Sequence, residues 1–306
     1  MGGEKLRTVL LAVIVPSAFF GLIEVGTRVS VSVPGPFFPS LASCRRRDPL
    51  LGYSFIPSCV GDVNGTPIRT NALGLRGDEL PQDARRRILA IGDSCTWGFR
   101  VSEAESYPAV LQRVLDERTG AKRYSVINAG TPGFTSHHGL LYLRERGILL
   151  RPALVLIGYE WNDGLPMGEV AQRLERVRRF QGLLQLDDWL RANSTFFRLV
   201  EYHTASQTTP ILESQVVPAK YRENVVAMVR LARAHDARAL LIDWNVPRSP
   251  YSEVLDDVSG ELAVPLMRYY GPRLPGDVVH PSAEGYRRFV TMLYESLRER
   301  GDVDVD

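Results

Sequence analysis

The stretch Ile88-Leu-Ala-Ile-Gly-Asp-Ser94-Cys-Thr-Trp-Gly98 joins a short, uninterrupted apolar run to a turn that carries a serine. Such a run is typical of a strand buried on both faces, as in a parallel sheet. Further strand-like runs occupy residues 124–127, 153–158 and 238–243, and segments with apolar residues at helical spacing separate them. The alternation of strands and helices predicts an α/β fold, a three-layer sandwich with a mostly parallel central sheet.

Three other segments are placed where this fold would bring them to the same edge as Ser94. Residues 128–136 and 158–163 directly follow predicted strands, and residues 277–280 precede the last predicted helix. In open α/β sheets, the ligand site lies beyond the carboxyl ends of the strands. We therefore expect the polar side chains of these segments to meet at one site.

Ser94, Asp277 and His280 are the residue types of a nucleophile, its orienting acid and its base. A serine hydroxyl attacks effectively only when a base accepts its proton. Of the five histidines, only His280 has an acid three residues earlier, which lets a loop bring the carboxylate to the imidazole. Taken singly, each is also compatible with a plainer role, because a serine often caps a helix and a histidine often lies in a loop.

A tetrahedral intermediate needs hydrogen-bond donors directed at its oxyanion. The backbone N–H groups of Ser94 and Gly133 and the side-chain amide of Asn162 are the candidates. A Pro-Gly turn at Gly133 and an Asx-turn at Asn162 are equally good explanations of these two residues when each is considered alone.

Taken together and in this order, the four segments resemble the blocks of the SGNH (GDSL-type) serine hydrolases, over about residues 87–300. The resemblance implies the flavodoxin-like SGNH hydrolase fold, with Ser94 as nucleophile and Asp277 and His280 completing the triad. It also implies an oxyanion hole formed by Ser94, Gly133 and Asn162.

Two features depart from the family pattern. Glu160 and Trp161 stand between the glycine and the asparagine of the third block, where many members have one residue. Cys95 follows the nucleophile, where a larger or hydroxylated residue is frequent. The first departure affects the placement of Asn162, and the sequence offers no explanation of the second.

The resemblance implies a serine esterase that hydrolyses a carboxylic ester through an acyl-enzyme, with O-acetyl groups on envelope carbohydrate as one candidate substrate. One alternative keeps the site but transfers the acyl group to an envelope polysaccharide. The other is a non-catalytic, membrane-tethered carbohydrate-binding protein. The segment at 48–77 also resembles the lead-in of membrane-anchored bacterial members of the family.

Composition narrows the possible partners. The chain has 306 residues, 44% of them hydrophobic and 24% charged, which is ordinary for a globular protein. A net charge of +2, with the arginines scattered along the chain, argues against nucleic-acid binding. The sequence contains no Cys/His cluster at metal-ligand spacing, so we expect neither a metal nor a cofactor.

The N-terminus carries an uncharged apolar run of sixteen residues at 8–23. Its length is near the lower limit for crossing a bilayer, so we predict a transmembrane anchor within residues 1–26 and an extracytoplasmic catalytic domain. A cleaved signal peptide, which would release the protein, and a buried helix are the alternatives. Cys44 and Cys59, in a segment rich in Pro, Gly and Ser, suit a disulfide of an exported protein, although two free thiols are also possible.

The predicted organisation has three parts. Residues 1–26 form the anchor or signal segment, and residues 27–86 form a linker followed by a small irregular β lead-in. Residues 87–306 form the hydrolase domain, with a helical insert at about 165–215.

Overall fold

The computed structural model forms two compact units: residues 1–42 with 175–211, and residues 43–174 with 212–306. The residues that it describes are 2–30, 44–63, 66–81, 86–119, 123–164, 190, 194–196, 200, 216–247 and 249–304. The predicted linker starts at residue 27, but helix α1 (Gly2–Ser30) includes residues 27–30. The rest of the linker and most of the predicted helical insert at 165–215 lie outside the described residues.

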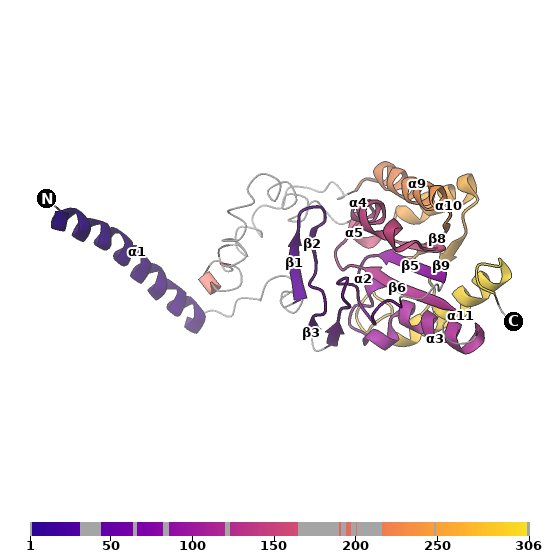
Figure 1. The fold of residues 1–306 in the computed structure, drawn as a ribbon, viewed down its shortest axis with the longest axis horizontal. Helices are drawn as coiled ribbons and strands as arrows, with labels where there is room; N and C mark the ends of the chain where they lie inside the picture. The colour runs from indigo at the N-terminus through magenta and orange to yellow at the C-terminus, as the bar shows by residue number, and fades with distance from the viewer. Residues whose placement is uncertain are drawn as a thin grey trace. The chain divides into compact units, whose positions relative to one another are not determined.

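The larger unit is built on a parallel sheet with the strand order β6-β5-β7-β8-β9 (Figure 1). Its strands are β5 (Arg86–Gly92), β6 (Tyr124–Gly130), β7 (Leu154–Gly158), β8 (Arg238–Asp243) and β9 (Leu266–Arg268). All four pairings are parallel. β5 therefore lies between β6 and β7, and the turn that carries Ser94 leaves the sheet next to the ends of both neighbours.

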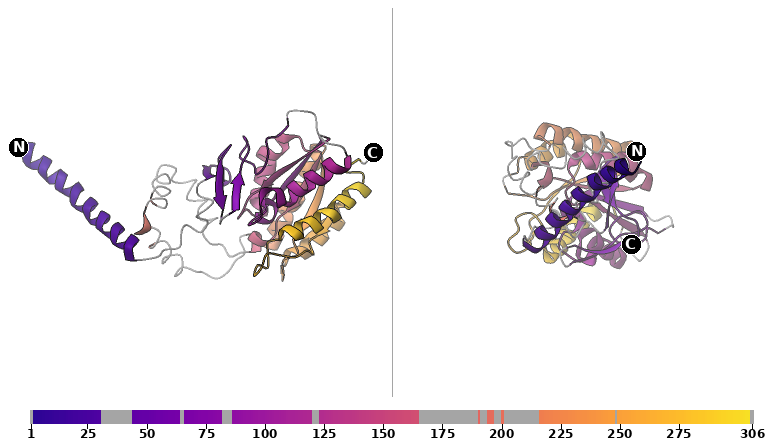
Figure 2. Two further views of the ribbon diagram at one scale, coloured as in Figure 1. Left: turned by 90° about the horizontal axis from the view of Figure 1, so that it is seen from below. Right: turned by 90° about the vertical axis from the view of Figure 1, so that its left-hand side faces the viewer.

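Helices cover both faces of this sheet (Figures 1 and 2). Leu89 and Ile91 of β5 pack on the side covered by α4 (Ser136–Tyr142), α9 (Pro218–Ala234) and α10 (Tyr251–Leu262). Ile88 and Ala90 pack on the side covered by α3 (Tyr107–Thr119) and α11 (Ala283–Glu299). Because alternate residues of one strand enter opposite cores, residues 88–91 of β5 are all apolar. This confirms the predicted α/β layers and parallel sheet.

The sequence does not predict strand β9 or helix α10, and the helix between β6 and β7 differs from the one that it predicts. Between β6 and β7, the sequence pattern predicts one helix over residues 138–149. In the structure this segment begins at Ser136, is α-helical to Tyr142, and continues as a π-helical turn over Leu143–Gly147 and a 3₁₀ turn over Ile148–Leu150. Periodicity misses β9 because the strand has only three residues, all of them partly exposed.

Residues 44–81, called the lead-in below, belong to the same compact unit as the sheet. They form two antiparallel hairpins, β1 (Arg45–Asp48) with β2 (Gly52–Phe55), and β3 (Val60–Val63) with β4 (Thr66–Arg69). Leu51 of the lead-in is 2% exposed and packs in the core beside the sheet. The lead-in is thus part of the packed unit that contains the sheet.

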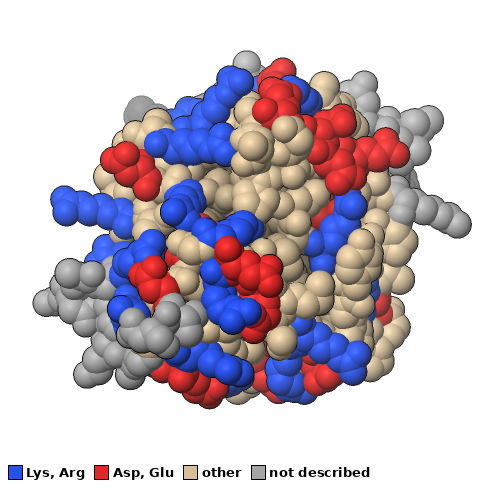
Figure 3. All heavy atoms as spheres, turned by 90° about the vertical axis from the view of Figure 1, so that its right-hand side faces the viewer, with Lys and Arg blue, Asp and Glu red and all other residues tan. Residues whose placement is uncertain are grey.

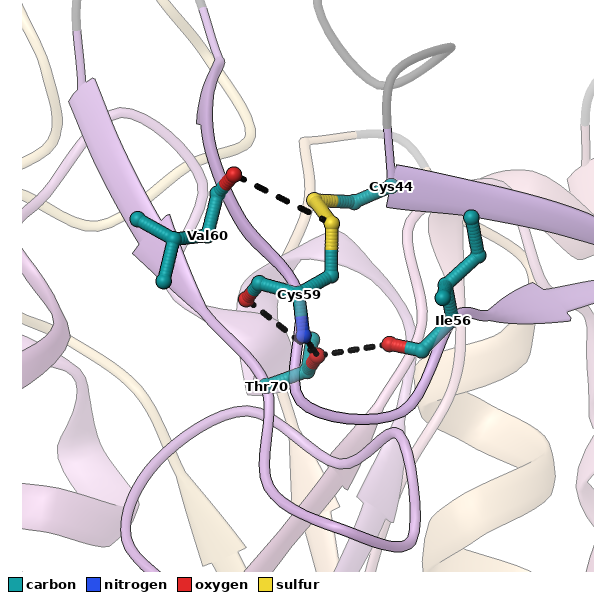
Figure 4. The surroundings of a disulfide bond; sticks show 5 residues. All are labelled: Cys44, Ile56, Cys59, Val60 and Thr70. Atoms are coloured by element: carbon teal, nitrogen blue, oxygen red, sulfur yellow. Dashed lines mark hydrogen bonds between the residues drawn. A yellow bond between two sulfur atoms is a disulfide. The ribbon is translucent and has the colours of Figure 1, made fainter.

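A disulfide between Cys44 and Cys59 closes the lead-in (Figure 4). Cys44 is fully buried. Beside the bridge, the Thr70 hydroxyl accepts a hydrogen bond from the Cys59 N–H at 3.0 Å and donates one to the Ile56 carbonyl at 2.7 Å. Of the two alternatives that the sequence left open, the structure has the bonded pair.

The N-terminal segment forms helix α1 (Gly2–Ser30) in the smaller unit. The structure describes the side chains of this helix for Val15 and residues 17–30, among which Glu24 and Arg28 form an ion pair at 2.7 Å. A membrane span needs about 20 predominantly apolar residues. Within the described part of the chain, no helix is long and apolar enough to cross a membrane. The predicted transmembrane helix is therefore not confirmed.

Charges of both signs are mixed on the face shown in Figure 3. At the amino end of β5, Arg86 pairs with Asp304 at 2.9 Å, and at the amino end of β8, Arg238 pairs with Asp302 at 2.8 Å. In each of these pairs two opposite charges neutralise each other locally.

Candidate active site

Ser94 is the first residue of α2 (Ser94–Trp97), the short helix that follows β5. Asp93 caps this helix: its Oδ1 accepts a hydrogen bond from the Cys95 N–H at 2.8 Å. Asp93 is fully buried, and burial raises the pKa of its carboxyl to about 7. Ser94 itself is 7% exposed, whereas the other three residues of α2 are fully buried.

Three glycines form the platform on which α2 lies. Gly92 is paired in register with Gly130 of β6 and with Gly158 of β7, so three neighbouring strands end in glycine at one level. A Cβ atom on Gly130 would lie 2.3 Å from the Trp97 nitrogen, and one on Gly92 would lie 2.0 Å from the Thr96 hydroxyl oxygen. No side chain fits between the strand ends and α2, so the serine can sit directly above the sheet.

The structure brings Ser94, His280 and Asp277 into one hydrogen-bonded line. Ser94 Oγ lies 2.9 Å from His280 Nε2, and His280 Nδ1 lies 2.7 Å from Asp277 Oδ2. The other carboxylate oxygen accepts bonds from the N–H groups of Val279 at 2.7 Å and His280 at 2.9 Å. With Nδ1–H donating to Asp277, the neutral ring has Nε2 as an acceptor facing the serine hydroxyl.

Burial and charge act in opposite directions on this pair. Burial lowers the pKa of His280 below its usual value, and Asp277 raises it only in part. Burial alone would raise the pKa of Asp277, but the hydrogen bonds from His280 and Val279 outweigh it, and the net pKa is lowered. Near neutral pH, His280 is therefore a neutral base beside an ionised carboxylate.

Arg273 holds the loop that carries these two residues. Its guanidinium donates to the Val279 carbonyl and also to the carbonyls of Trp244 at 2.8 Å and Asn245 at 2.9 Å. The loop that carries His280 is thus fixed to the chain that leaves β8. The ring of Phe99 lies 4.8 Å from the imidazole of His280, measured between ring centroids.

Gly133 lies in the turn that follows β6. The Phe134 N–H donates to the Thr131 carbonyl at 3.1 Å, and Gly133, at the third position of the turn, has φ +82°. This geometry is that of a type II turn, which favours glycine at this position. Tyr53 of the lead-in donates to the Pro132 carbonyl, and its ring packs edge-on against Phe134 at 5.1 Å. The lead-in therefore supports this turn directly.

Asn162 lies in α5 (Trp161–Gly164), after β7, and is 7% exposed. Its Nδ2 donates to the Phe134 carbonyl at 3.0 Å, which fixes the amide beside the turn that contains Gly133. An amide nitrogen carries two hydrogens, so one remains for a ligand. The neighbouring Asp163 accepts bonds from the N–H of Ser136 at 2.9 Å and from its hydroxyl at 2.6 Å, which joins the same two loops.

The structure accounts for both departures from the family pattern. Glu160 is fully buried, its pKa is raised to about 7 by burial, and its Oε1 accepts a hydrogen bond from Ser252 of α10 at 3.4 Å. The extra residue therefore contacts α10, while Asn162 still bonds to the Phe134 carbonyl. Cys95 is also fully buried, 3.7 Å from the Val279 carbonyl, and burial raises the pKa of its thiol well above the usual value. Its small side chain packs against the loop that carries His280.

Three residues at the site had no role in the sequence-based expectation. Arg273 holds the His280 loop, Tyr286 of α11 donates to the Cys95 carbonyl at 2.6 Å, and Arg76 donates to the Trp97 carbonyl at 2.6 Å. Each binds main-chain carbonyls, which every residue type provides. A weak signal existed only for Arg76, which lies in the segment at 48–77 that resembles the lead-in of other family members.

Comparisons with known proteins agree with this architecture. The sequence model of the GDSL-like Lipase/Acylhydrolase family matches residues 90–288. Esterase TesA of Pseudomonas aeruginosa is 22% identical over 231 residues, covering 71% of this chain and 90% of that protein. Thioesterase 1/protease 1/lysophospholipase L1 of Escherichia coli K12 is 35% identical over 92 residues, covering 30% of this chain and 41% of that protein.

A crystal structure of TesA also aligns, with a TM-score of 0.49 and 22% identity, covering 70% of this chain and 99% of that one. The match to the family model begins within β5, before Ser94, and reaches beyond His280, and so includes every predicted triad and oxyanion-hole residue. The chain therefore belongs to the GDSL-like lipase/acylhydrolase family and is an ester-hydrolysing enzyme.

Proposed function

We propose that Ser94, His280 and Asp277 form the catalytic triad of this enzyme, which hydrolyses a carboxylic ester through an acyl-enzyme. The observation that carries the proposal is the hydrogen-bonded line from Ser94 Oγ to His280 Nε2 at 2.9 Å and from His280 Nδ1 to Asp277 Oδ2 at 2.7 Å. The lowered pKa of His280 keeps its ring neutral near pH 7, as a base must be.

In the first half of the reaction, Ser94 Oγ attacks the ester carbonyl carbon while its proton passes to His280 Nε2. The carbonyl oxygen becomes an oxyanion, which accepts hydrogen bonds from the backbone N–H groups of Ser94 and Gly133 and from the Asn162 amide. Asp277 stabilises the imidazolium. When the tetrahedral intermediate collapses, the ester C–O bond breaks and His280 gives its proton to the leaving alcohol.

In the second half, water takes the place of the alcohol. His280 Nε2 accepts a proton from the water as its oxygen attacks the acyl carbon, and the same three donors hold the second oxyanion. Collapse breaks the bond to Ser94 Oγ, which recovers the proton from His280 and releases the carboxylic acid. In each half-reaction His280 gives up the proton that it accepted, so the protons balance without a cofactor.

The test uses the full chain, short-chain aryl esters and a fluorophosphonate that labels activated serines. Ser94→Ala and His280→Ala should each lower kcat by about 10⁴-fold or more, and labelling should map to Ser94. Ser106→Ala, a buried serine outside the line, and the exposed His235→Ala should leave kcat unchanged. Activity that survives both Ser94→Ala and His280→Ala would rule out the proposal.

We also propose that the catalytic unit works outside the cytoplasm. The Cys44–Cys59 disulfide supports this location, because such bonds persist in oxidising compartments and are rare in a reducing cytosol. Trapping free thiols in intact cells should find both cysteines oxidised; finding them reduced would contradict the location. Fractionating the same cells tests whether residues 1–26 tether the protein, which stays a prediction.

For the substrate, we propose O-acetyl groups on envelope carbohydrate, a choice that rests on the extracytoplasmic location. A panel of acetylated sugars, acyl lipids and thioesters should show the highest kcat/KM for an acetylated sugar. Adding sugar acceptors and analysing the products separates hydrolysis from acyl transfer. A preference for long-chain acyl lipids or thioesters would contradict the substrate proposal and leave the triad untouched.

A further inference from the structure

Helix α2 is too short to satisfy its own carbonyl groups. The last four carbonyls of an α-helix have no partner within it, and α2 has only four residues. The Ser94 carbonyl accepts bonds from the N–H groups of Gly98 and Phe99, each at 3.0 Å. All four residues of α2 are buried, so the carbonyls that follow must find donors elsewhere in the fold.

Arg76 of the lead-in supplies these donors. Its Nη1 donates to the carbonyls of Trp97 at 2.6 Å and Gly98 at 2.7 Å, and its Nη2 donates to the Val101 carbonyl at 2.9 Å. Arg76 is 4% exposed, and its guanidinium lies 4.0 Å from the centroid of the Trp97 ring. One guanidinium thus binds the end of α2 and the chain that leaves it.

The charged guanidinium of Arg76 forms its hydrogen bonds with main-chain carbonyls. Among the described residues, no carboxylate lies within ion-pair distance of it, whereas the exposed Arg69 of the same lead-in pairs with Asp78 at 2.6 Å and Glu103 at 2.8 Å. Burial lowers the pKa of Arg76 to about 10, so the guanidinium stays charged near neutral pH. A planar fork of donors suits adjacent carbonyls in a way that a lysine ammonium cannot reproduce.

The backbone of Arg76 also joins α2 to the neighbouring strand. Arg76 forms an isolated antiparallel bridge with Asn128 of β6, and the Asn128 side chain donates to the same Trp97 carbonyl at 3.3 Å. The end of α2 is therefore held from two sides by groups that are themselves linked. The strand glycines Gly92 and Gly130 lie against Thr96 and Trp97, so Arg76 adds hydrogen bonds at the same end of α2 that packs on the sheet.

Resting on the proposed role of Ser94 as nucleophile, we infer that Arg76 is a positioning residue that keeps the Ser94 hydroxyl in line with His280. The distance that must be maintained is the 2.9 Å between Ser94 Oγ and His280 Nε2. A displacement of about 1 Å at a reacting group can cost about 10²-fold in rate. Because Arg76 binds α2 and contributes no contact in the proposed mechanism to the substrate itself, its loss should lower kcat and leave KM nearly unchanged.

The experiment compares Arg76→Met and Arg76→Lys with Arg87→Met in the full chain. Arg87 is the matched control, because its guanidinium also donates to a main-chain carbonyl, that of Leu150 at 2.8 Å, but at the amino end of β5. Each variant is assayed for kcat, KM, Tm and the rate constant of fluorophosphonate labelling at Ser94. Both Arg76 variants should lose about 10- to 100-fold in kcat and in labelling rate, with KM within about two-fold. Arg87→Met should lower Tm alone.

Chemical rescue separates positioning from general stability. In Arg76→Ala, added guanidinium at concentrations far below those that denature proteins should raise kcat and the labelling rate, with no effect on the wild type. Loss of stability alone would not respond in this way, because guanidinium does not stabilise a fold.

Wild-type kcat and labelling rate in Arg76→Met would overturn the inference. If Arg76→Met does not fold, Arg76→Lys becomes the test, and a wild-type kcat in that variant would also overturn the inference. If the wild type is not labelled at Ser94, that result would instead contradict the proposed function. The two failures are therefore distinguishable.

Discussion

At the scale of single residues, two opposing influences set the pKa of His280. Its ring lies 4.8 Å from that of Phe99, tilted by 40°, and is largely shielded from water, which disfavours the charged form. The bond from Nδ1 to Asp277 Oδ2 at 2.7 Å favours the charged form. Burial is the larger of the two influences, so the resting ring is neutral and can accept a proton.

This balance predicts the acid side of the pH profile. Only neutral His280 can accept the proton of Ser94, so kcat/KM should rise with pH through the pKa of His280. Because that pKa is lowered from 6.5, half-maximal kcat/KM should fall below pH 6.5, with a plateau by about pH 7. Hydrolysis of a neutral aryl ester measured from acid to neutral pH checks this expectation. A midpoint above pH 6.5 would contradict it, and His235→Ala should not move it.

At the scale of elements, the packing of α2 against the strand ends determines the position of Ser94, the proposed nucleophile. Gly92, Gly130 and Gly158 lie side by side in register, and α2 packs on them without intervening side chains. The same arrangement explains why three of the four sequence segments contain a glycine at the end of a buried strand. Space, rather than backbone conformation, is the requirement at these three positions.

Gly130→Ala tests this packing. The added Cβ would lie 2.3 Å from the Trp97 nitrogen, so α2 must shift. Overpacking of this kind costs about 1–3 kcal/mol in the free energy of unfolding, and kcat should fall because Ser94 moves with the helix. Urea unfolding and aryl ester hydrolysis measure the two effects.

Gly260→Ala is the control for this substitution. Gly260 lies within α10, and a Cβ there meets no atom within 4 Å, so alanine should stabilise the protein by about 0.5–1 kcal/mol without affecting kcat. Equal stability of the Gly130→Ala variant and the wild type would show that α2 has room to move.

At the scale of the whole molecule, the lead-in is part of the catalytic unit. Tyr53 contacts the turn that contains Gly133, Arg76 binds the end of α2, and Asp48, almost fully buried, pairs with Arg146 at 2.6 Å. A segment that could have been a spacer therefore supports two of the loops that form the site. The Cys44–Cys59 disulfide closes this segment on itself.

Removing the disulfide should therefore weaken the unit as a whole. A bridge between residues 15 apart in sequence constrains the unfolded chain, and its loss in Cys44→Ser/Cys59→Ser should cost about 3 kcal/mol. Thermal unfolding of the double variant, and of the wild type with and without a reducing agent, measures the effect. A reducing agent should not change the Tm of the double variant, because the remaining Cys95 is buried and unpaired. An unchanged Tm in the double variant would contradict the prediction.

Much of the fold and the site follows from local sequence. The apolar runs at 88–91 and 238–243 predict buried strands because every side chain on such a strand enters a core. The spacing of Asp277 and His280 predicts their contact, since a loop of four residues can close on itself. Strand β9 was missed because a strand of three partly exposed residues has no clear period, and α10 was missed although Ser249 accepts a hydrogen bond from the Tyr251 N–H at its start.

The sequence by itself determined the layered α/β architecture, the edge of the sheet at which the site lies and the residues proposed to carry the chemistry. These features depend on local patterns, and the carboxyl ends of parallel strands converge whatever the loops contain. Only the tertiary structure decided that Cys44 bonds to Cys59, that Glu160 faces α10, and that Arg76 and Arg273 hold the two loops of the site. Guanidinium groups bind main-chain carbonyls, which are the same at every residue, so no sequence pattern identifies the partner.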